Sequence, residues 1–382
     1  MNNSSIIYVN FAQYDNTGRI LDYLLENFHI VAHFSFDHLR LKNGRKTNFV
    51  RVYVDGKCIH QRKLLSIRTP GPFLFPSLPI VAVLMLLQTI IYSFRLNLRY
   101  GKFEYYFTVN AFSAWIGILA QKLFLIRKTV FWVWDYYPLL YPDWRIRLAR
   151  RIYWWLDKSC MKLSNKIIFT NIKLLKLRQE TGHLGPKKKV KIVPIGTEIL
   201  PIEFKKDERV ILGFLGMLKE NQGIDLIFDS IDLLIKQNPH IKIEIIGSGP
   251  EELRFKERGK KYTKHISFLG FIEDQDKIIQ IIKKWSIGLA TYKPVEKNES
   301  YWGDPSKIKK YIGAGVPVIT TDVSYFSEII KKHKAGVLIA YTPESLAGGV
   351  LTILKNELMY KKKAHELAKK YNYKTLYSKI FI

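Results

Sequence analysis

Between residues 209 and 341, short apolar runs rich in β-branched residues alternate with amphipathic segments of helical length. The apolar runs are 209–216, 241–250, 265–272, 286–292, 316–321 and 335–341. Strands that alternate with helices of about 10 to 15 residues form parallel sheets covered by helices on both faces. The pattern therefore predicts a doubly wound α/β domain in the second half of the chain.

The first half repeats this alternation less regularly, with apolar runs at 5–11, 29–36, 103–110, 129–135 and 166–171. A chain of 382 residues is also too long for one ordinary core. The polar, non-periodic stretch 195–208 is the expected linker. We predict an α/β protein of two Rossmann-like doubly wound domains facing a cleft, at 1–195 and 196–360, with a helical segment 361–382 that packs back on the first domain.

The charge is strongly positive, with a net value of +28. Residues 1–200 hold 30 Lys and Arg against 11 Asp and Glu, and residues 201–382 hold 31 against 22, so the excess is +19 and +9. Such a field favours anionic partners: nucleic acid, lipid headgroups or phosphorylated substrates. The sequence shows no RRM, KH, zinc-finger or helix-turn-helix signature, which argues against nucleic acid.

Two cysteines, Cys58 and Cys160, without a CxxC pattern make a disulfide framework or a zinc site improbable and favour the cytoplasm. The start of the chain lacks the pattern of a signal peptide. Residues 69–94 carry no charge, but their helical part after Pro79 is short of the roughly 20 residues of a membrane span. We expect a buried or interfacial helix there.

Residues 141–158 form an aromatic and basic amphipathic pattern. It fits either a core helix with a solvated basic face or a helix at an anionic membrane surface. Together with 69–94 and the basic first half, it favours a peripheral protein at the inner face of the cell membrane.

Ligands of open α/β sheets bind beyond the carboxyl ends of the strands. In the second half, Gly216 and Lys219 follow one predicted strand, where a glycine lets a phosphate approach the backbone and a lysine supplies charge. Gly247 and Gly249 follow the next strand and fit either a phosphate loop or a plain tight turn. Tyr292 ends a further strand before a long polar loop.

The stretch 301–321, YWGDPSKIKKYIGAGVPVITT, places a lysine at the mouth of a short helix. Asp304 or Ser306 can cap this helix, and Pro305 suits its first turn. Lys307 is poorly placed for the helix dipole, which favours negative charge at the N-terminus. Lys307 is either a solvated helix start or a group that holds an anionic ligand.

In the first half, Asp135 ends the apolar strand 129–135 and is a candidate acid or base, although it can equally cap the next turn. Gly18, in the loop after the first strand, is a candidate for contact with donor phosphates.

Several segments in this order resemble the nucleotide-sugar glycosyltransferases of the GT-B type, in particular glycosyltransferase family 4. The segments are FLGMLKENQGIDLIFDSI, IEIIGSGPEE, ISFLGFIE, GLATY and DPSKIKKYIGAGVPVITT, within 190–350. The first half matches more loosely, through an Asn at one strand end and an Asp-Tyr-x-Pro at the next. Many family members carry two glutamates eight positions apart, where this chain has Trp302 and Lys310.

The resemblance implies a glycosyltransferase that moves a sugar from a nucleotide-sugar donor to a lipid-linked or polysaccharide acceptor in cell-surface glycan biosynthesis. It implies no bound metal or other cofactor, and a retaining outcome. Its alternatives are a nucleotide-sugar epimerase of the same fold or a non-catalytic scaffold. The resemblance implies Lys307 and Lys219 as ligands of the diphosphate, whereas the family's sugar and ribose contacts cannot be carried over. The donor-side candidates as a whole are Gly18, Gly216, Lys219, Gly247, Gly249, Tyr292, Ser306, Lys307 and Tyr311, with Asn110 and Tyr137 on the acceptor side and Asp135 and Asp304 as catalytic candidates.

Overall fold

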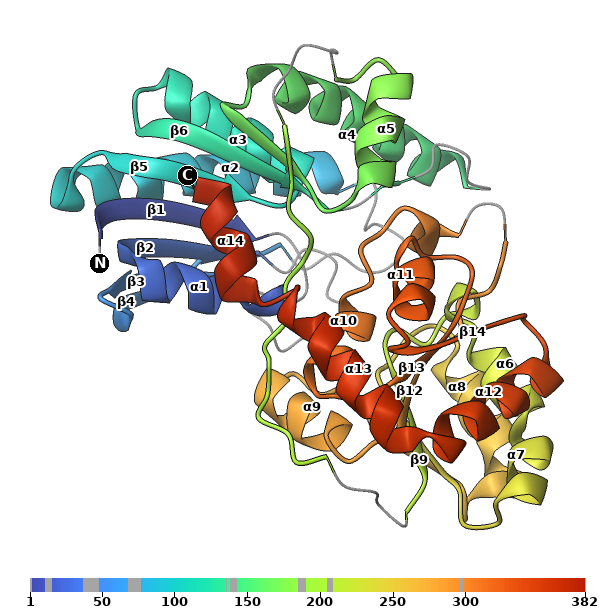
Figure 1. Cartoon of the computed structure of the whole chain (residues 1–382). Helices are drawn as coiled ribbons and strands as arrows, with labels where there is room; N and C mark the ends of the chain where they lie inside the picture. The colour runs from blue at the N-terminus through green and yellow to red at the C-terminus, as the bar shows by residue number, and fades with distance from the viewer. Residues whose placement is uncertain are drawn as a thin grey trace. The chain divides into compact units, whose positions relative to one another are not determined.

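The computed structural model describes residues 2–10, 16–36, 48–67, 77–134, 136–137, 143–184, 190–204, 209–295 and 298–381. It divides into two compact units, Met1–Pro194 with Tyr377–Ile382, and Ile195–Leu376 (Figure 1). The predicted fold class is confirmed, because each unit is built on a largely parallel sheet with helices on its faces.

The first unit contains an eight-stranded sheet in the order β4-β3-β2-β1-β5-β6-β7-β8. Its strands are β1 (Asn2–Asn10), β2 (Phe28–Ser35), β3 (Phe49–Val54), β4 (Lys57–Lys63), β5 (Phe103–Thr108), β6 (Ile126–Val133), β7 (Lys166–Phe169) and β8 (Lys191–Ile192). Its helices are α1 (Ile20–Asn27), α2 (Leu78–Tyr100), α3 (Ala111–Lys122), α4 (Trp144–Leu163) and α5 (Ile172–Glu180). The strands are parallel except for the β3–β4 hairpin, whose neighbour β2 also pairs antiparallel with β3.

Two layers of helices cover this sheet. Helix α2 packs beside α3, and α3 packs beside α4, so these three helices form one layer. Helix α1 and the end of the C-terminal helix α14 (Tyr373–Phe381) lie on the other face (Figure 1). There the Tyr23 ring meets the Tyr377 ring edge-on at 5.7 Å and stacks on the Phe381 ring at 6.2 Å. The hydroxyl of Tyr377 also donates a hydrogen bond of 2.7 Å to the Gly18 carbonyl.

Helix α2 is longer than the sequence predicted, because it continues through Arg95 and Arg99 and ends at Tyr100, with Gly101 as its C-cap. It contains the one stretch, Pro79–Tyr100, that is long and apolar enough among the described residues to cross a membrane. One side of α2 nevertheless belongs to the core: Val81, Met85 and Leu96 pack against the sheet. The prediction that this helix is too short for a membrane span is therefore wrong. Its burial in the core is confirmed for one face, and its contact with a membrane interface stays a prediction.

The second unit contains a six-stranded, wholly parallel sheet in the order β11-β10-β9-β12-β13-β14. Its strands are β9 (Ile211–Leu215), β10 (Lys242–Ile246), β11 (Ile266–Gly270), β12 (Ile287–Ala290), β13 (Val318–Thr321) and β14 (Gly336–Ile339). Its helices are α6 (Ile224–Asp229), α7 (Ile231–Gln237), α8 (Glu252–Gly259), α9 (Gln275–Ile282), α10 (Ser306–Gly313), α11 (Phe326–Lys332), α12 (Pro343–Lys355) and α13 (Glu357–Lys369). This order is that of a doubly wound sheet, whose winding direction reverses between β9 and β12.

One predicted helix of the second unit is divided in two. The sequence predicts a continuous helix over 223–237, whereas the structure breaks it at Ser230 into α6 and α7. The Ser230 hydroxyl donates to the Leu226 carbonyl at 2.6 Å, a local bond that competes with regular helical geometry.

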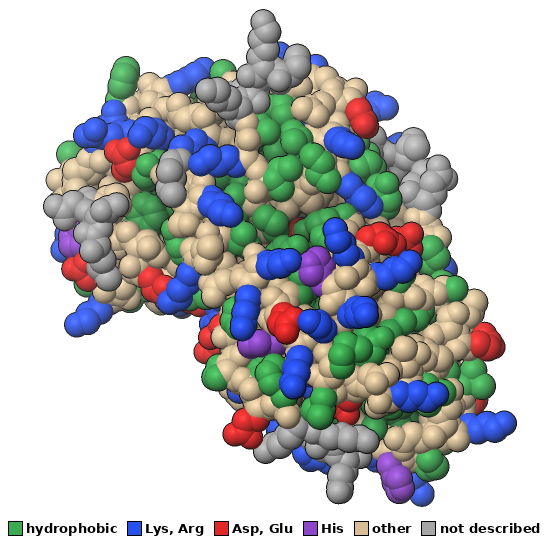
Figure 2. All heavy atoms as spheres, in the orientation of Figure 1, with side chains coloured by type: hydrophobic (Ala, Val, Ile, Leu, Met, Phe, Trp, Pro, Cys, Tyr) green, Lys and Arg blue, Asp and Glu red, His purple; other side chains and the backbone are tan. Residues whose placement is uncertain are grey.

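The charge excess is spread widely. Lys and Arg side chains lie across the visible face of both units and predominate there over Asp and Glu (Figure 2).

Candidate active site

The carboxyl ends of β9, β10, β12 and β13 lie along one edge of the second sheet. The switch point between β9 and β12 is where doubly wound sheets bind their ligands. The chain leaves β9 through Gly216 and Lys219, and leaves β12 through Tyr292 before it reaches α10 and Lys307. The structure thus brings together predicted donor residues from the end of β9, the end of β12 and the start of α10.

Lys307 lies in the first turn of α10, and its side chain is held from several sides. Its Nζ donates to Gln222 Oε1 at 2.8 Å and lies 4.3 and 4.9 Å from the ring centroids of Phe214 and Tyr292. Aromatic faces attract an ammonium group at such distances. The expected side-chain cap is not present: the N-cap residue is Pro305, with no side-chain hydrogen bond. Lys307 is therefore no solvated helix start.

Burial lowers the pKa of Lys307 to about 7, and the nearby charge of Lys219 lowers it further. Desolvation and a like charge both disfavour the protonated ammonium. An anionic ligand at this position would reverse both effects, because it supplies the missing counter-charge. A nearby negative charge would therefore raise the pKa of Lys307.

Lys219 is the second cation of the site, and it pairs with a residue that sequence reasoning missed. Its Nζ lies 3.1 Å from Glu299 Oε2, at the start of the short 3-10 helix Glu299–Tyr301. Gln222, which accepts from Lys307, was missed as well. Both pairings join segments about 80 residues apart. Local patterns carry no signal for such contacts.

Glycines bring the loops after β9 and β10 into backbone contact. Gly247 has φ 142°, and a Cβ there would lie 1.8 Å from the Gly216 carbonyl oxygen. A Cβ on Gly249 would lie 2.4 Å from the Leu218 carbonyl oxygen. Gly216 has φ 154°, and a Cβ there would lie 3.0 Å from the Nζ of Lys307. Gly247 and Gly249 thus allow the loop after β10 to pack closely on the loop after β9. Gly216 leaves room beside the ammonium group of Lys307.

The two tyrosines predicted to contact the donor differ in whether their side chains face the site. The Tyr311 hydroxyl accepts from the Leu215 amide at 2.8 Å and donates to the Leu289 carbonyl at 3.3 Å, and its side chain is fully buried. Tyr311 therefore fastens α10 to the sheet, and we correct its assignment from ligand to support. Tyr292 is also buried, but its ring faces Lys307 directly.

Asp304, predicted to be catalytic, is enclosed instead in a buried network. Its carboxylate forms an ion pair with Lys309, accepts from the Tyr325 hydroxyl at 2.8 Å and accepts from the Ile195 amide at 2.6 Å. The side chains of Asp304 and Lys309 are both inaccessible to solvent. A carboxylate with these partners cannot reach a substrate, so Asp304 holds the turn before α10.

The first-unit candidates lie at the carboxyl edge of its own sheet. Asn110 follows β5 and caps α3, accepting from the Phe112 amide at 2.9 Å. The Tyr137 carbonyl accepts from Trp154 Nε1 at 2.9 Å. Gly18 has φ 63°, a left-handed conformation that suits glycine. Asp135 lies outside the described residues, and its role stays a prediction.

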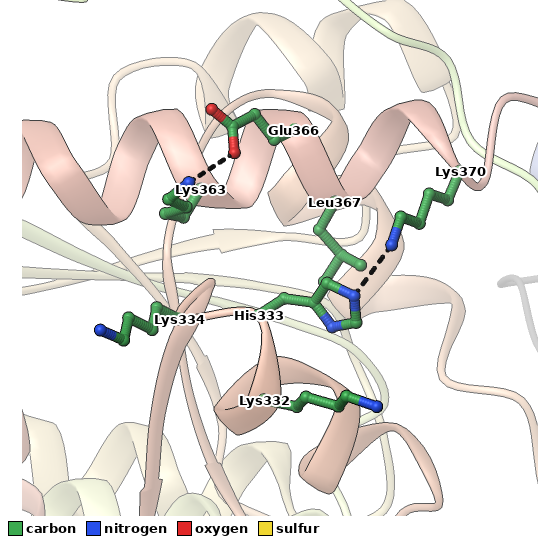
Figure 3. Close-up of a pocket in the computed structure, with 7 residues that line it drawn as sticks. All are labelled: Lys332, His333, Lys334, Lys363, Glu366, Leu367 and Lys370. Atoms are coloured by element: carbon green, nitrogen blue, oxygen red, sulfur yellow. Dashed lines mark hydrogen bonds and ion pairs between the residues drawn. The ribbon is translucent and has the colours of Figure 1, made fainter.

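A separate hollow of about 420 Å³ lies between the end of α11 and α13, lined mainly by lysines (Figure 3). Lys370 Nζ lies 3.0 Å from His333 Nε2, and Lys363 pairs with Glu366 at 2.8 Å. Lys332 and Lys334 point away from each other. Lys332 and Lys370 lie at the C-terminal ends of α11 and α13, where a lysine offsets the negative end of the helix dipole.

In the described part of the chain, no three His, Cys, Asp or Glu residues are placed to hold a metal ion together.

Comparison with known proteins supports the assignment of this unit. Residues 209–356 match the family model "Glycosyl transferases group 1". Spore coat protein SA of Bacillus subtilis is 29% identical over 139 residues, which is 35% of each chain. Phosphatidyl-myo-inositol mannosyltransferase of Mycobacterium tuberculosis is 22% identical over 152 residues, 38% of each chain. These matches span little more than a third of the curated relatives.

Solved structures match over nearly the whole chain. Sucrose-phosphate synthase from Thermosynechococcus elongatus has a TM-score of 0.69 at 14% identity, covering 99% of this chain and 97% of its own. Anabaena HepE in complex with UDP has a TM-score of 0.61 at 13% identity, covering 98% of each. The chain therefore has the GT-B fold, and its residues 209–356 resemble the glycosyl transferases group 1.

Proposed function

We propose that the protein is a glycosyltransferase that moves a sugar from a nucleotide-sugar donor to a lipid-linked or polysaccharide acceptor in cell-surface glycan biosynthesis. The observation that carries the proposal is the pair Lys307 and Lys219 beside Gly216, at the switch point of the second sheet. Two relatives support it by name, one as a mannosyltransferase and one as a spore coat protein.

In the proposed reaction, the acceptor hydroxyl oxygen bonds to the anomeric carbon on the face that the diphosphate leaves, as the bond between the sugar and the diphosphate breaks. The hydroxyl proton passes to the departing diphosphate oxygen. Negative charge then develops on the leaving diphosphate. We expect Lys307 and Lys219, together with the N-terminus of α10, to stabilise that charge, and we expect the reaction to need no divalent metal. The aromatic rings of Phe214 and Tyr292 and the amide of Gln222 fix the ammonium of Lys307 before the substrate arrives. We expect the anomeric configuration to be retained.

We also propose that the protein works as a peripheral protein at an anionic membrane surface, where a lipid-linked acceptor would lie. The excess of +19 in the first 200 residues supports this location, because basic residues near a bilayer are attracted to anionic lipids. So does the phosphatidyl-myo-inositol in the name of one relative.

The test is incubation of the protein with a panel of UDP-, GDP- and other nucleotide sugars, with and without membrane extract and with EDTA present. Transfer of labelled sugar into lipid or glycan supports the proposal, and the product's anomeric configuration tests retention. An epimerised nucleotide sugar would instead identify an epimerase. No turnover of any donor would indicate a non-catalytic scaffold and overturn the proposal.

A further inference from the structure

Helix α2 has two opposite faces, and only one of them belongs to the core. On its inner side, Gln88 binds the backbone of Leu65, accepting from its amide at 2.6 Å and donating to its carbonyl at 3.2 Å. The outer side carries large apolar residues spaced three or four apart, which puts them on one helical stripe. They are Ile80, Val83, Leu87, Ile91, Phe94 and Leu98, each between 47% and 74% exposed.

Helix α4, in the same layer, presents a similar stripe. Trp144, Leu148, Ile152 and Trp155 follow one another at spacings of four, four and three, and each is at least half exposed. The opposite side of α4 is buried through Trp154, Cys160 and Met161. Both stripes therefore point away from the sheet. Soluble monomers rarely expose large apolar residues in such stripes, and this layer presents two of them.

The turn after α3 adds an apolar projection at the end of the same layer. Leu123 and Phe124 are 57% and 80% exposed. Phe124 has φ 59°, a conformation that bulky residues seldom adopt. The ends of α2 and α3 lie together, because Asn97 Nδ2 donates to the Leu125 carbonyl at 2.6 Å.

The charges on α2, α3 and α4 indicate which kind of partner binds the apolar face. Helices α2, α3 and α4 contain two, one and six Lys or Arg residues, nine together, and one acidic residue. That acid, Asp157, is buried in an ion pair with Arg178. An apolar stripe flanked by Lys and Arg, with no exposed acid on these helices, is the pattern of a helix in the headgroup region of an anionic bilayer. A partner protein of ordinary composition would not require such a one-sided charge.

We propose that the outer face of the α2–α3–α4 layer lies on an anionic membrane, with α2 in the plane of the bilayer and not across it. A spanning α2 would have to leave the sheet and break both hydrogen bonds between Gln88 and Leu65. In the in-plane arrangement the inner face keeps its core contacts, while the stripe and Phe124 enter the lipid. The inference rests on the proposed function for the reason to bind a membrane, which is a lipid-linked acceptor. The surface itself is argued from the exposed side chains and charges of α2, α3 and α4.

Flotation with vesicles tests the proposal. Full-length protein is mixed at low salt with phosphatidylcholine vesicles, with or without 30 mol% phosphatidylglycerol. We expect binding to the anionic vesicles only. Phe124→Gly suits the backbone at that position and should weaken binding about tenfold, as should Phe94→Ser. Arg95→Gln with Arg99→Gln should weaken it at least tenfold, since each basic residue near the surface contributes about fivefold.

Leu253→Ser is the matched control, because Leu253 is 84% exposed on α8 of the second unit. This variant should bind vesicles as the unmodified protein does. UDP binding, measured by calorimetry, should be unchanged in every variant, so misfolding would be seen separately. The proposal is overturned if the protein ignores anionic vesicles, if the Phe124 and Phe94 variants bind normally, or if the stripe instead makes the protein dimerise in sedimentation velocity. Vesicle binding without glycosyl transfer would contradict only the proposed function.

Discussion

In the second unit, Asp304 forms a buried ion pair with Lys309 five residues along the chain, whereas in the first unit Asp157 of α4 pairs with Arg178 of α5, 21 residues away. The first pair is local and closes the turn from which α10 begins, so it fixes the position of Lys307. The second pair is tertiary and holds α4 on α5, so it fixes the helix that presents the apolar stripe. In each unit, a buried ion pair thus holds one functional helix in position.

The largest expected effect comes from breaking either pair. Asp304→Ala and Asp157→Ala should each lower the free energy of unfolding by about 3 to 5 kcal/mol, because each leaves a buried cation without a partner. Chemical denaturation with urea measures this loss. Asp304→Asn combined with Lys309→Met should recover much of the stability.

The comparison predicts that the two variants lose different activities, one UDP binding and the other vesicle binding. The folded fraction of Asp304→Ala should bind UDP poorly and keep its vesicle binding, and Asp157→Ala should do the reverse. Equal loss of both activities in both variants would show that the pairs serve stability without positioning their helices.

The next effect concerns turnover. Lys307→Ala should lower kcat/KM for the donor by about ten- to a thousand-fold, the range expected when a preorganised charge at a developing anion is lost. Steady-state rates with the donor identified in the panel measure it. Lys277→Ala, which removes an exposed lysine of α9, should leave the rate unchanged. Wild-type activity in Lys307→Ala would remove the central group from the proposed site.

The smallest effect concerns Glu299, which neutralises Lys219 in the absence of ligand. Glu299→Gln should tighten UDP binding about two- to fivefold, because a partly exposed ion pair contributes little and its carboxylate repels the diphosphate. Calorimetry with UDP measures the change. Weaker binding would instead place Glu299 among the groups that contact the donor.

The sequence allowed the two sheets, the first largely and the second wholly parallel, and the place of Lys307 to be predicted, because strand periodicity, glycines and a first-turn lysine are local signals. It did not reveal that Asp304 and Lys309 are buried together. In the run Lys307-Ile308-Lys309-Lys310 all three lysines look alike, and only tertiary packing on Phe326 and Tyr371 distinguishes Lys309. The partners Gln222 and Glu299 were missed for the same reason.

The central claim is that Lys307 holds the donor diphosphate, and its pKa of about 7 gives the most direct test. Calorimetry of UDP binding between pH 7 and 9, in buffers of different ionisation enthalpy, reports both affinity and protons exchanged. Lys307 is largely neutral in the free protein above pH 7, and a bound anion raises its pKa. Binding should therefore take up close to one proton near pH 8 and weaken as the pH rises, and Lys307→Met should abolish the uptake. Binding that exchanges no proton, with an affinity that Lys307→Met does not change, would contradict the account.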